Sequence, residues 1–479
     1  MTVFLSHSGS DTQRADVLRQ RLEAAGTPVW FDKENLKPGT ERWQRQHERA
    51  IEEEVSAFVV YVGARGIVNW VRREVDLAVS RATRSGAPFP VVPVISDRAT
   101  GSRHLPGFIS QFQAVRDVEG DPKAWAQLLG ALKGNGGAAV EPEPFFNLEA
   151  ITAERGHLFF GRKQETEEAG DRLWKHGTLL IAGASGSGKS SLARAGLVSD
   201  WKGGEIALRH QVDPRTIDWH VVVTRPGSAP RDMLARSIDD AAKALGRSEA
   251  AITEYRRLAR EGDPEDVRRA LLSGHDWERT RTLLIVDQFE ELVHPIVGKK
   301  DRQDFANLIA ALADPDDPSV CVALTMRDDY TNRLKDEELA PLAARLDSAD
   351  RAPRYVLPPM TSTGLRASIE DPLALARRSP KEATALANAV RADVGLRSEN
   401  TAGLQSTLAR PGDLALVQFA VSLAWDDRGR HDDDLLRPYA ESGRVEGALA
   451  NAAERVFQNA CEKGAEAAML EAALLRLTV

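Results

Sequence analysis

The chain has 479 residues, too many for one hydrophobic core, and this length predicts about three domains. A hydrophobic content of 42% and a charged content of 28% are ordinary for globular proteins and exclude disorder over most of the chain. The net charge of −8 argues against a nucleic-acid partner, because no overall basic field is present to displace counterions from phosphates.

The two cysteines, Cys321 and Cys461, are far apart and have no His or Cys neighbour at metal-ligand spacing. They therefore indicate neither a zinc site nor a disulfide framework. No stretch approaches the roughly 20 apolar residues needed to cross a bilayer, and the N-terminus lacks the basic region of a secretory signal. By elimination, we expect a cytoplasmic protein with no membrane partner.

The first block, residues 1–133, alternates strand and helix patterns. Apolar runs predict strands, and apolar residues three and four apart predict helices over 15–25 and 70–83. The predicted strands are residues 3–6, 28–32, 57–62 and 91–95. Because strands that alternate with helices form parallel sheets covered on both faces, we expect an α/β domain.

The rest of the chain divides into a linker and two further blocks. Residues 134–148 include a Gly- and Pro-rich stretch without periodicity and predict the linker. Residues 149–360 again alternate strand and helix, whereas residues 361–479 are mostly helical in pattern. The predicted strands are residues 178–182, 220–224, 282–287, 320–325 and 354–357. The prediction is therefore a second parallel-sheet α/β domain followed by a helical region.

Residues 183–190 read GASGSGKS and fit the phosphate-binding pattern G-x-x-x-x-G-K-[ST] in full, between a predicted strand and a predicted helix. The glycines let backbone N–H groups converge on phosphate oxygens, and the helix N-terminus adds its dipole. We therefore predict a site for ATP or dATP, and for ADP, with Mg²⁺ as cofactor. Its residues are Gly183, Ser185, Gly186, Ser187, Gly188, Lys189, Ser190 and Ser191, with Lys189 on the β- and γ-phosphates and Ser190 on Mg²⁺.

A second buried-type strand ends at Asp287, about a hundred residues after the phosphate loop. We expect Asp287 to hold Mg²⁺ through water. Gln288 stands where many hydrolytic relatives have Glu, so we expect slow hydrolysis, with Glu290 or Glu291 as the candidate to activate water. A third strand leads to Arg327, which is either a sensor of the γ-phosphate or a surface residue.

Several segments on either side of the phosphate loop resemble those of a known family. Residues 160–165, FGRKQE, resemble the G-R-x-x-E entry motif of STAND NTPases, the signal-transduction ATPases with numerous domains. Residues 225–228, 287–291, 357–361 and 410–419 are similar to one prokaryotic branch of that class. The resemblance extends from about residue 145 to the C-terminus. It implies that Arg162 contacts the nucleotide near the base, that Arg327 is the first sensor, and that a helical and winged-helix lid follows Thr361.

The chain departs from the pattern of STAND NTPases in two respects. Family members often have a second proline shortly after the Pro-Gly pair, where this chain has Leu414-Ala-Leu. STAND proteins also usually carry a C-terminal sensor made of repeats, and the sequence has none. Because the chain ends in an apolar run, we expect either truncation within the winged-helix region or sensing by a partner.

The first block resembles TIR domains. Residues 3–11, VFLSHSGSD, match their first box, and VWFD at 29–32 followed by LKPG at 36–39 matches the strand and loop used in self-assembly. Residues 69–75, NWVRREV, match the W-x-x-x-E helix of TIR domains that cleave NAD⁺. The resemblance implies a flavodoxin-like fold with NAD⁺ as substrate.

The spacing of Trp70 and Glu74 places both on one helix face. A carboxylate beside the ribose of NAD⁺ offsets the positive charge that develops when neutral nicotinamide leaves, so Glu74 is the predicted catalytic residue. Trp70 is predicted to stack on a ring. Ser6, Phe4 and Trp30 lie near the edge where open α/β sheets bind ligands and are predicted NAD-binding residues, although a core role for Phe4 and Trp30 stays open.

Together these motifs predict an ATP-gated immune switch directed against phage. A trigger, either a phage protein or a partner sensor, would open the lid; the chains would then form a homo-oligomer. The TIR domains would hydrolyse NAD⁺ to nicotinamide and ADP-ribose, beside a slow ATPase. Two alternative functions remain open: a TIR domain that only recruits partners, and a P-loop module that works as a hydrolytic motor. For Glu74 itself, the alternative is a solvated residue paired to Arg72 or Arg73 on an exposed helix.

Overall fold

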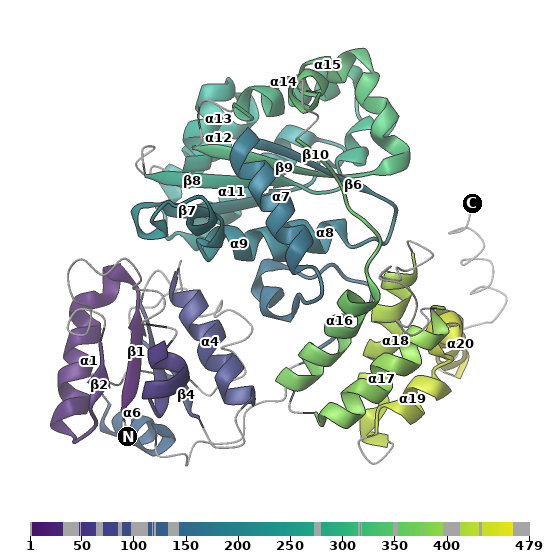
Figure 1. Cartoon of the computed structure of the whole chain (residues 1–479). Helices are drawn as coiled ribbons and strands as arrows, with labels where there is room; N and C mark the ends of the chain where they lie inside the picture. The colour runs from purple at the N-terminus through teal and green to yellow at the C-terminus, as the bar shows by residue number, and fades with distance from the viewer. Residues whose placement is uncertain are drawn as a thin grey trace. The chain divides into compact units, whose positions relative to one another are not determined.

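The computed structural model describes most of the chain. The described residues are 2–31, 47, 49–63, 70–84, 89–96, 114–116, 118, 121–132, 143–272, 279–314, 317, 319–347, 353–376, 378–395, 412–430 and 434–462. They form two compact units (Figure 1). The first comprises Met1–Pro142, Ile151–Ala184 and Lys189–Leu357, and the second comprises Glu143–Ala150, Ser185–Gly188 and Pro358–Val479.

The N-terminal sheet has five parallel strands in the order β2-β1-β3-β4-β5. This is the flavodoxin-like order, and it confirms the predicted fold. The strands are β1 Val3–His7, β2 Val29–Trp30, β3 Ala57–Val62, β4 Val91–Ile95 and β5 Val115–Arg116. The helices are α1 Thr12–Ala24, α4 Trp70–Arg84 and α6 Pro122–Gly130, with a π-helical turn at Ala50–Glu54.

Alternate residues of β1 serve different faces of this sheet. Val3 and Leu5 belong to a core shared with Leu18 and Leu22 of α1 and with Leu128 of α6. The residues between them point to the opposite face, because successive side chains of a strand alternate. Helix α4 packs against β1 and β4.

The second sheet is also fully parallel, in the order β10-β6-β9-β8-β7. Its strands are β6 Thr178–Gly183, β7 Asp218–Thr224, β8 Thr280–Val286, β9 Val320–Arg327 and β10 Arg354–Val356. All five predicted strands are present, with ends shifted by one or two residues. The second parallel-sheet α/β domain of the prediction is therefore confirmed.

Helices cover both faces of the second sheet. Leu180, Leu284 and Leu324 pack on one face into a core with α11 to α15. Leu179 and Leu283 pack on the other face into a core with α7, α9, α10 and the π-helical segment Leu192–Leu197. Burial on both faces explains why these strands are continuous apolar runs. The helices are α7 Lys163–His176, α8 Lys189–Ser191, α9 Val198–Lys202, α10 Glu205–Arg209, α11 Pro230–Ala244, α12 Glu249–Glu261, α13 Pro264–Leu272, α14 Lys299–Leu312 and α15 Ala340–Leu346.

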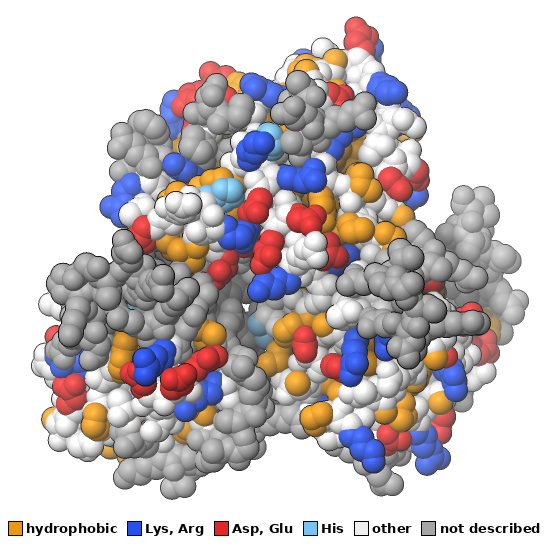
Figure 2. Space-filling view, in the orientation of Figure 1, with side chains coloured by type: hydrophobic (Ala, Val, Ile, Leu, Met, Phe, Trp, Pro, Cys, Tyr) orange, Lys and Arg blue, Asp and Glu red, His pale blue; other side chains and the backbone are white. Residues whose placement is uncertain are grey.

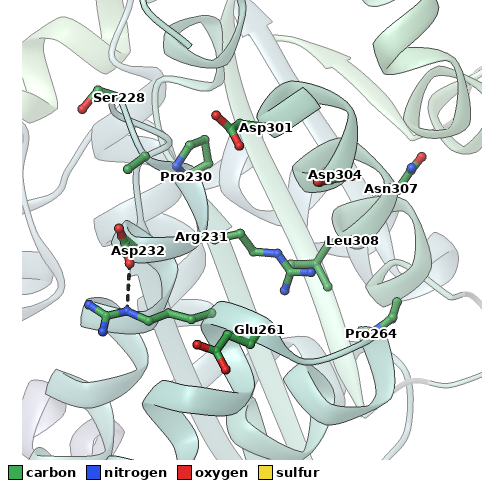
Figure 3. A pocket seen from close by; sticks show the side chains of 12 residues that line it. Ser228, Pro230, Arg231, Asp232, Glu261, Pro264, Asp301, Asp304, Asn307 and Leu308 are labelled. Carbon is green, nitrogen blue, oxygen red and sulfur yellow. Dashed lines mark ion pairs between the residues drawn. The ribbon is translucent and has the colours of Figure 1, made fainter. Parts of the chain in front are cut away.

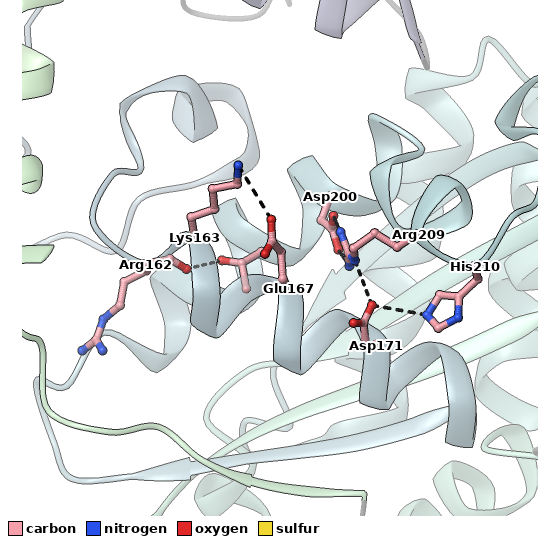
Figure 4. A network of polar contacts seen from close by, with 8 residues as sticks. Arg162, Lys163, Glu167, Asp171, Asp200, Arg209 and His210 are labelled. Carbon is pink, nitrogen blue, oxygen red and sulfur yellow. Dashed lines mark hydrogen bonds and ion pairs between the residues drawn. The ribbon is translucent and has the colours of Figure 1, made fainter. Parts of the chain in front are cut away.

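An ion-pair network joins α7, α9 and α10 (Figure 4). Arg209 donates from Nη1 and Nη2 to the two carboxylate oxygens of Asp200, at 2.7 and 2.8 Å, and from Nε to Asp171 at 2.8 Å. Burial raises the pKa of Asp200. A Cβ at Gly170 would lie 2.5 Å from the Asp200 carboxylate, so the close approach of the two helices requires glycine there. The network therefore fixes the helix that precedes the phosphate-binding strand β6.

The second unit consists mainly of helices, as predicted for this part of the chain. They are α16 Ser362–Leu375, α17 Pro380–Asp393, α18 Asp413–Asp427, α19 Leu436–Glu441 and α20 Arg444–Glu462. Leu365, Leu386 and Val421 are among the residues of its core. The predicted winged helix is not tested by the described residues, and residues 463–479 lie outside them.

Residues 143–150 belong to this helical unit. Phe145 is buried in its core and meets Trp425 edge-on, with 6.5 Å between ring centroids. The backbone N–H of Asn147 donates to Ser422 Oγ at 3.1 Å. The last part of the predicted linker is therefore packed against α18, whereas residues 134–142 lie outside the described residues.

No helix within the described part of the chain is both long and apolar enough to cross a membrane.

Replacing Asp200 with Ala should lower the free energy of unfolding of the second α/β domain by about 3 kcal/mol, because the partly buried Arg209 loses its bidentate partner and keeps only Asp171. Urea unfolding followed by tryptophan fluorescence measures this change, since Trp201 and Trp174 lie beside the network. Glu254→Ala is the matched control: Glu254 pairs with Arg257 on the surface, at 2.7 Å, and its removal should leave the unfolding curve in place. Coincident curves for Asp200→Ala and wild type would contradict the prediction.

Candidate functional site

The phosphate loop follows strand β6, and helix α8 begins at Lys189. Gly186 and Gly188 have positive φ values of 73° and 92°, which residues with a Cβ rarely adopt. A Cβ at Gly186 would also lie 3.2 Å from the Cα of Gly412, and one at Gly188 would lie 3.4 Å from Leu414. Within the helical unit, the tip of the loop therefore abuts the start of α18.

A buried carboxylate lies at the centre of the second sheet's site. The Asp287 side chain is fully buried, and its Oδ1 accepts hydrogen bonds from Ser190 Oγ and Thr325 Oγ1, both at 2.7 Å. The strand register explains this meeting: Val286 of β8 pairs with Leu324 of β9, so the residues that follow lie side by side. The predicted partners Ser190 and Asp287 are thus brought together.

The second oxygen of Asp287, Oδ2, has no hydrogen-bond partner among the described residues. Its nearest cations are Arg225 at 3.6 Å and Arg194 at 3.9 Å, too far for hydrogen bonds. A buried carboxylate oxygen without a partner, next to a serine hydroxyl, fits a Mg²⁺ ion, which binds oxygen ligands and keeps several waters. Ser190 and Asp287 are therefore suited to hold that ion.

Lys189 is buried at the base of the loop and donates from Nζ to the Ala184 carbonyl at 2.7 Å. Burial lowers the pKa of Lys189, while Glu290, Asp328 and Asp287 act in the opposite direction. An ammonium group in a poorly solvated site interacts more strongly with phosphate oxygens than one in water. The geometry thus gives Lys189 the surroundings that its predicted role requires.

The two candidate glutamates point to different places. Glu290 Oε2 accepts the backbone N–H of Arg327 at 3.3 Å, and burial raises the pKa of Glu290. Glu291 Oε2 accepts the backbone N–H of Gly227 at 3.0 Å, in the segment after β7. Of the two glutamates, Glu290 is the one whose charge affects the pKa of Lys189. Glu290 is therefore the better placed of the two to activate a water molecule beside the phosphates.

The structure places the two predicted arginines in ion pairs. Arg327 lies beside Gly183 in the register of β6 and β9, and its half-exposed guanidinium pairs with Asp329 at 2.6 Å. Arg162 is buried and pairs with Glu165 at 2.5 Å; its guanidinium extends away from Asp171 and Arg209 (Figure 4). Their contacts with nucleotide stay predictions.

The remaining predicted loop residues surround this site. Ser187 is buried, whereas Ser185 is exposed at the tip of the loop. Ser191 Oγ accepts the backbone N–H of Ile151 at 3.2 Å, so it holds the chain that enters the domain. The predicted contact of Ser191 with nucleotide stays a prediction.

Sequence reasoning missed Thr325, Arg194 and Arg225. Thr325 carried a usable signal, because it is a polar residue near the end of a buried parallel strand. Arg194 follows the phosphate loop by one helical turn, which places it on the same side of the helix as Ser190. Arg225 comes directly after β7, at the same edge of the sheet.

In the N-terminal domain, Glu74 is buried and held from two sides. Ser6 Oγ, on β1, donates to Glu74 Oε2 at 2.6 Å, and His47 Nδ1 forms a hydrogen bond with Glu74 Oε1. Phe4 stacks on Trp30 with 4.5 Å between ring centroids, and His47 meets both rings edge-on. The alternative of a solvated Glu74 on an exposed helix does not agree with this geometry.

Two parts of the predicted NAD⁺ site lie outside what the structure describes. Trp70 begins α4, but its side chain is not among the described ones, and residues 36–39 are not described. His47 was missed by sequence reasoning. It precedes the buried residues Ala50 and Ile51 by three and four positions, which places it on the buried side of a helical turn.

Comparisons with known proteins identify the two domains that contain these residues. The sequence matches the family model of Novel STAND NTPase 1 over residues 144–479. The chain belongs to the STAND NTPases. A TIR domain model matches residues 3–129. The protein is therefore a fusion of a TIR domain with a STAND NTPase, as predicted, and this pairing supports a signalling or defence switch built on a nucleotide-binding fold.

No curated protein matches the chain. Among solved structures, the ORC2 protein of Aeropyrum pernix in its ADPNP–ADP complexes has a TM-score of 0.36 and 15% identity, covering 62% of this chain and 70% of that one. NtrX from Brucella abortus in complex with ADP has a TM-score of 0.26 and 12% identity, covering 94% of this chain and 98% of that one.

A pocket of about 570 Å³ opens elsewhere in the STAND NTPase, among the ends of α11 to α14 (Figure 3). Arg260 pairs with Asp232 at its rim, at 2.8 Å, and Arg231 donates to the carbonyls of Ala259 and Gly262. None of the predicted nucleotide residues lines it. Its polar groups thus connect neighbouring helices, and the predicted nucleotide residues lie elsewhere, around Asp287.

Thr325→Val should weaken Mg²⁺-dependent nucleotide binding by about tenfold. The change keeps the volume but removes the hydroxyl that donates to Asp287 and accepts from the Gln288 backbone N–H. Titration with a fluorescent ATP analogue, with Mg²⁺ and with EDTA, measures the effect. Thr325→Ser keeps the hydroxyl and is the matched control; equal affinity of the Val and Ser variants would contradict the role of this contact.

Proposed function

We propose that this protein is an ATP-gated, oligomerising immune switch whose TIR domain hydrolyses NAD⁺ upon activation. The observation that carries the enzymatic part is the buried Glu74 carboxylate, held by Ser6 and His47 on the W-x-x-x-E helix. A buried, oriented carboxylate in an α/β domain is a feature of catalytic sites more than of solvated helix surfaces. NAD⁺ depletion in the cytoplasm would then arrest a phage-infected cell.

The proposed reaction needs one negative charge in the right place. The bond between ribose C1′ and the nicotinamide nitrogen breaks, its electron pair neutralises the pyridinium ring, and C1′ becomes positively charged. Water adds to C1′ and releases a proton, so the products are nicotinamide, ADP-ribose and H⁺. Glu74 would stabilise the charged ribose, because a carboxylate acts strongly where solvent is excluded. The stacked rings of Phe4 and Trp30 support a site with an aromatic wall.

The proposed nucleotide gate uses the loop and its neighbours. Bound phosphates would form ion pairs with the Lys189 ammonium group. Mg²⁺ would be held by Ser190 and Asp287, where it would neutralise phosphate charge. The loop tip at Gly186 and Gly188 abuts the start of α18, so its occupancy would bear directly on the helical unit. We propose that this is how nucleotide keeps that unit in its resting arrangement.

Oligomerisation would complete the switch. STAND NTPases commonly oligomerise, and linking TIR domains to an assembling module raises their local concentration. On the face that Figure 2 shows, the Lys and Arg side chains of the described residues are interspersed with Asp and Glu. The trigger we propose is a phage protein or a partner sensor.

Slow turnover suits such a gate. Gln288 adopts φ 57° and ψ 50°, a strained conformation for a residue with a side chain, and its backbone N–H is tied to Thr325 Oγ1 at 2.9 Å. Glu290 is the carboxylate that we propose to activate water. A site with Gln after the magnesium carboxylate, and with its base displaced along the chain, would hold ATP long enough for assembly.

The oligomerised full-length protein should release nicotinamide and ADP-ribose from NAD⁺, and Glu74→Gln should lower the rate by at least about a hundredfold. Mass analysis of the products measures both and distinguishes linear from cyclic ADP-ribose. Val17→Ala, at an exposed apolar position of α1, is a control that should leave the rate unchanged. Equal rates for wild type and Glu74→Gln would favour the alternative function, a TIR domain that recruits partners without cleaving NAD⁺.

Lys189→Ala should prevent ATP-dependent assembly, because it removes the cation at the base of the phosphate loop. Light scattering coupled to size exclusion, with and without ATP and Mg²⁺, measures the mass of the particles. Lys163→Ala removes an exposed lysine of α7 and is the matched control. Assembly of Lys189→Ala to the wild-type mass would show that nucleotide is not the gate.

A further inference from the structure

The buried carboxylate of Glu74 has donors on two separate segments of the chain. Ser6 on β1 donates to one oxygen at 2.6 Å, and His47, in the segment that leads to the turn Ala50–Glu54, bonds to the other. Glu74 and His47 are each only 3% exposed. Both oxygens of the proposed catalytic group are therefore fixed by side chains that lie far from it in the sequence.

The chemistry of the pair defines which atom carries the proton. An ionised carboxylate only accepts hydrogen bonds, so Nδ1 of His47 must be the donor toward Glu74. Moving a carboxylate out of water is unfavourable unless hydrogen bonds compensate for it. The N–H of His47 and the hydroxyl of Ser6 supply that compensation on opposite sides of the carboxylate.

Aromatic packing fixes the direction of the imidazole. The ring meets Trp30 at 5.0 Å with an interplanar angle of 84° and meets Phe4 at 5.7 Å with an angle of 72°. These edge-on contacts are a favourable arrangement for aromatic rings. Because Phe4 also stacks on Trp30, the three rings form one packed group that turns Nδ1 toward Glu74.

We infer that His47 is a positioning residue of the NAD⁺ site: its Nδ1–H holds the Glu74 carboxylate oriented toward the ribose. This inference rests on the proposed NAD⁺ hydrolysis. It goes beyond that proposal because it assigns a role to a residue outside the W-x-x-x-E helix. His47 acts through Glu74 and contributes to the transition state by keeping the charge in place.

Two substitutions separate the hydrogen bond from the packing. His47→Leu replaces the imidazole with an apolar side chain of similar size and so removes the hydrogen-bond donor. His47→Asn places an amide N–H near the position of Nδ1. In the oligomerised full-length protein, His47→Leu should lower kcat for NAD⁺ hydrolysis by about 10- to 100-fold, with KM changed little. His47→Asn should recover part of that loss.

A spectroscopic measurement tests the same contact without relying on turnover. In protein labelled with ¹⁵N-histidine, the His47 resonance is identified by its loss in His47→Asn. Glu74→Gln should shift its Nδ1 signal, because the acceptor changes from a carboxylate to an amide. A shift would support the contact on which the inference rests, and an unchanged signal would overturn the inference.

The outcomes distinguish this inference from the proposed function. If wild type hydrolyses NAD⁺ and His47→Leu retains the full kcat, the positioning role is wrong while the proposed function stands. A kcat that falls equally in the Leu and Asn variants would also overturn the role, because the donor would then make no difference. If wild type does not hydrolyse NAD⁺ but the Nδ1 signal responds to Glu74→Gln, the proposed function fails and the positioning of Glu74 by His47 is supported.

Discussion

The buried carboxylate of Asp287 joins three parts of the STAND NTPase: the helix after the phosphate loop, through Ser190, the strand β8 that it terminates, and β9, through Thr325. The meeting depends on the parallel register of the sheet, which brings strand ends to one edge. A negative charge in that position is unfavourable without partners, so the arrangement favours a cation at this edge. The TIR domain also has a buried carboxylate that accepts a hydrogen bond from a serine: Glu74 of helix α4, with Ser6 of β1.

Much of the fold was predictable from the sequence because both sheets are parallel and buried on two faces. Strands of that kind are continuous apolar runs, and β1, β3, β4 and β6 were all found in this way. Strand β5 has only two residues, too few to show any pattern. The phosphate loop was predictable for a different reason: its chemistry is local, with glycines, lysine and serine adjacent in the chain.

The remainder of each site depends on residues that only the fold brings together. Thr325 and Asp287 are 38 positions apart, and His47 and Glu74 are 27 apart. Neither pair has a spacing that a helix or a strand would place on one face. The burial of Glu74 was also beyond the sequence, since helix spacing alone is equally compatible with a solvated residue paired to a neighbouring arginine. Long-range contacts of this kind determine the hydrogen bonding and burial of the motif's side chains in a particular chain.

The packing of Phe145 against Trp425 determines where the N-terminal boundary of the STAND NTPase module lies. The match to the STAND NTPase family begins at residue 144, so the segment that fills the helical core is inherited with that module. A gene fusion or a cloned fragment that begins at residue 151 would leave the core beside α18 incomplete. A junction just before residue 143 would preserve it. Any effector domain placed before that junction would be linked directly to the helical unit. N-terminal domains could therefore be exchanged without a change in the STAND NTPase module.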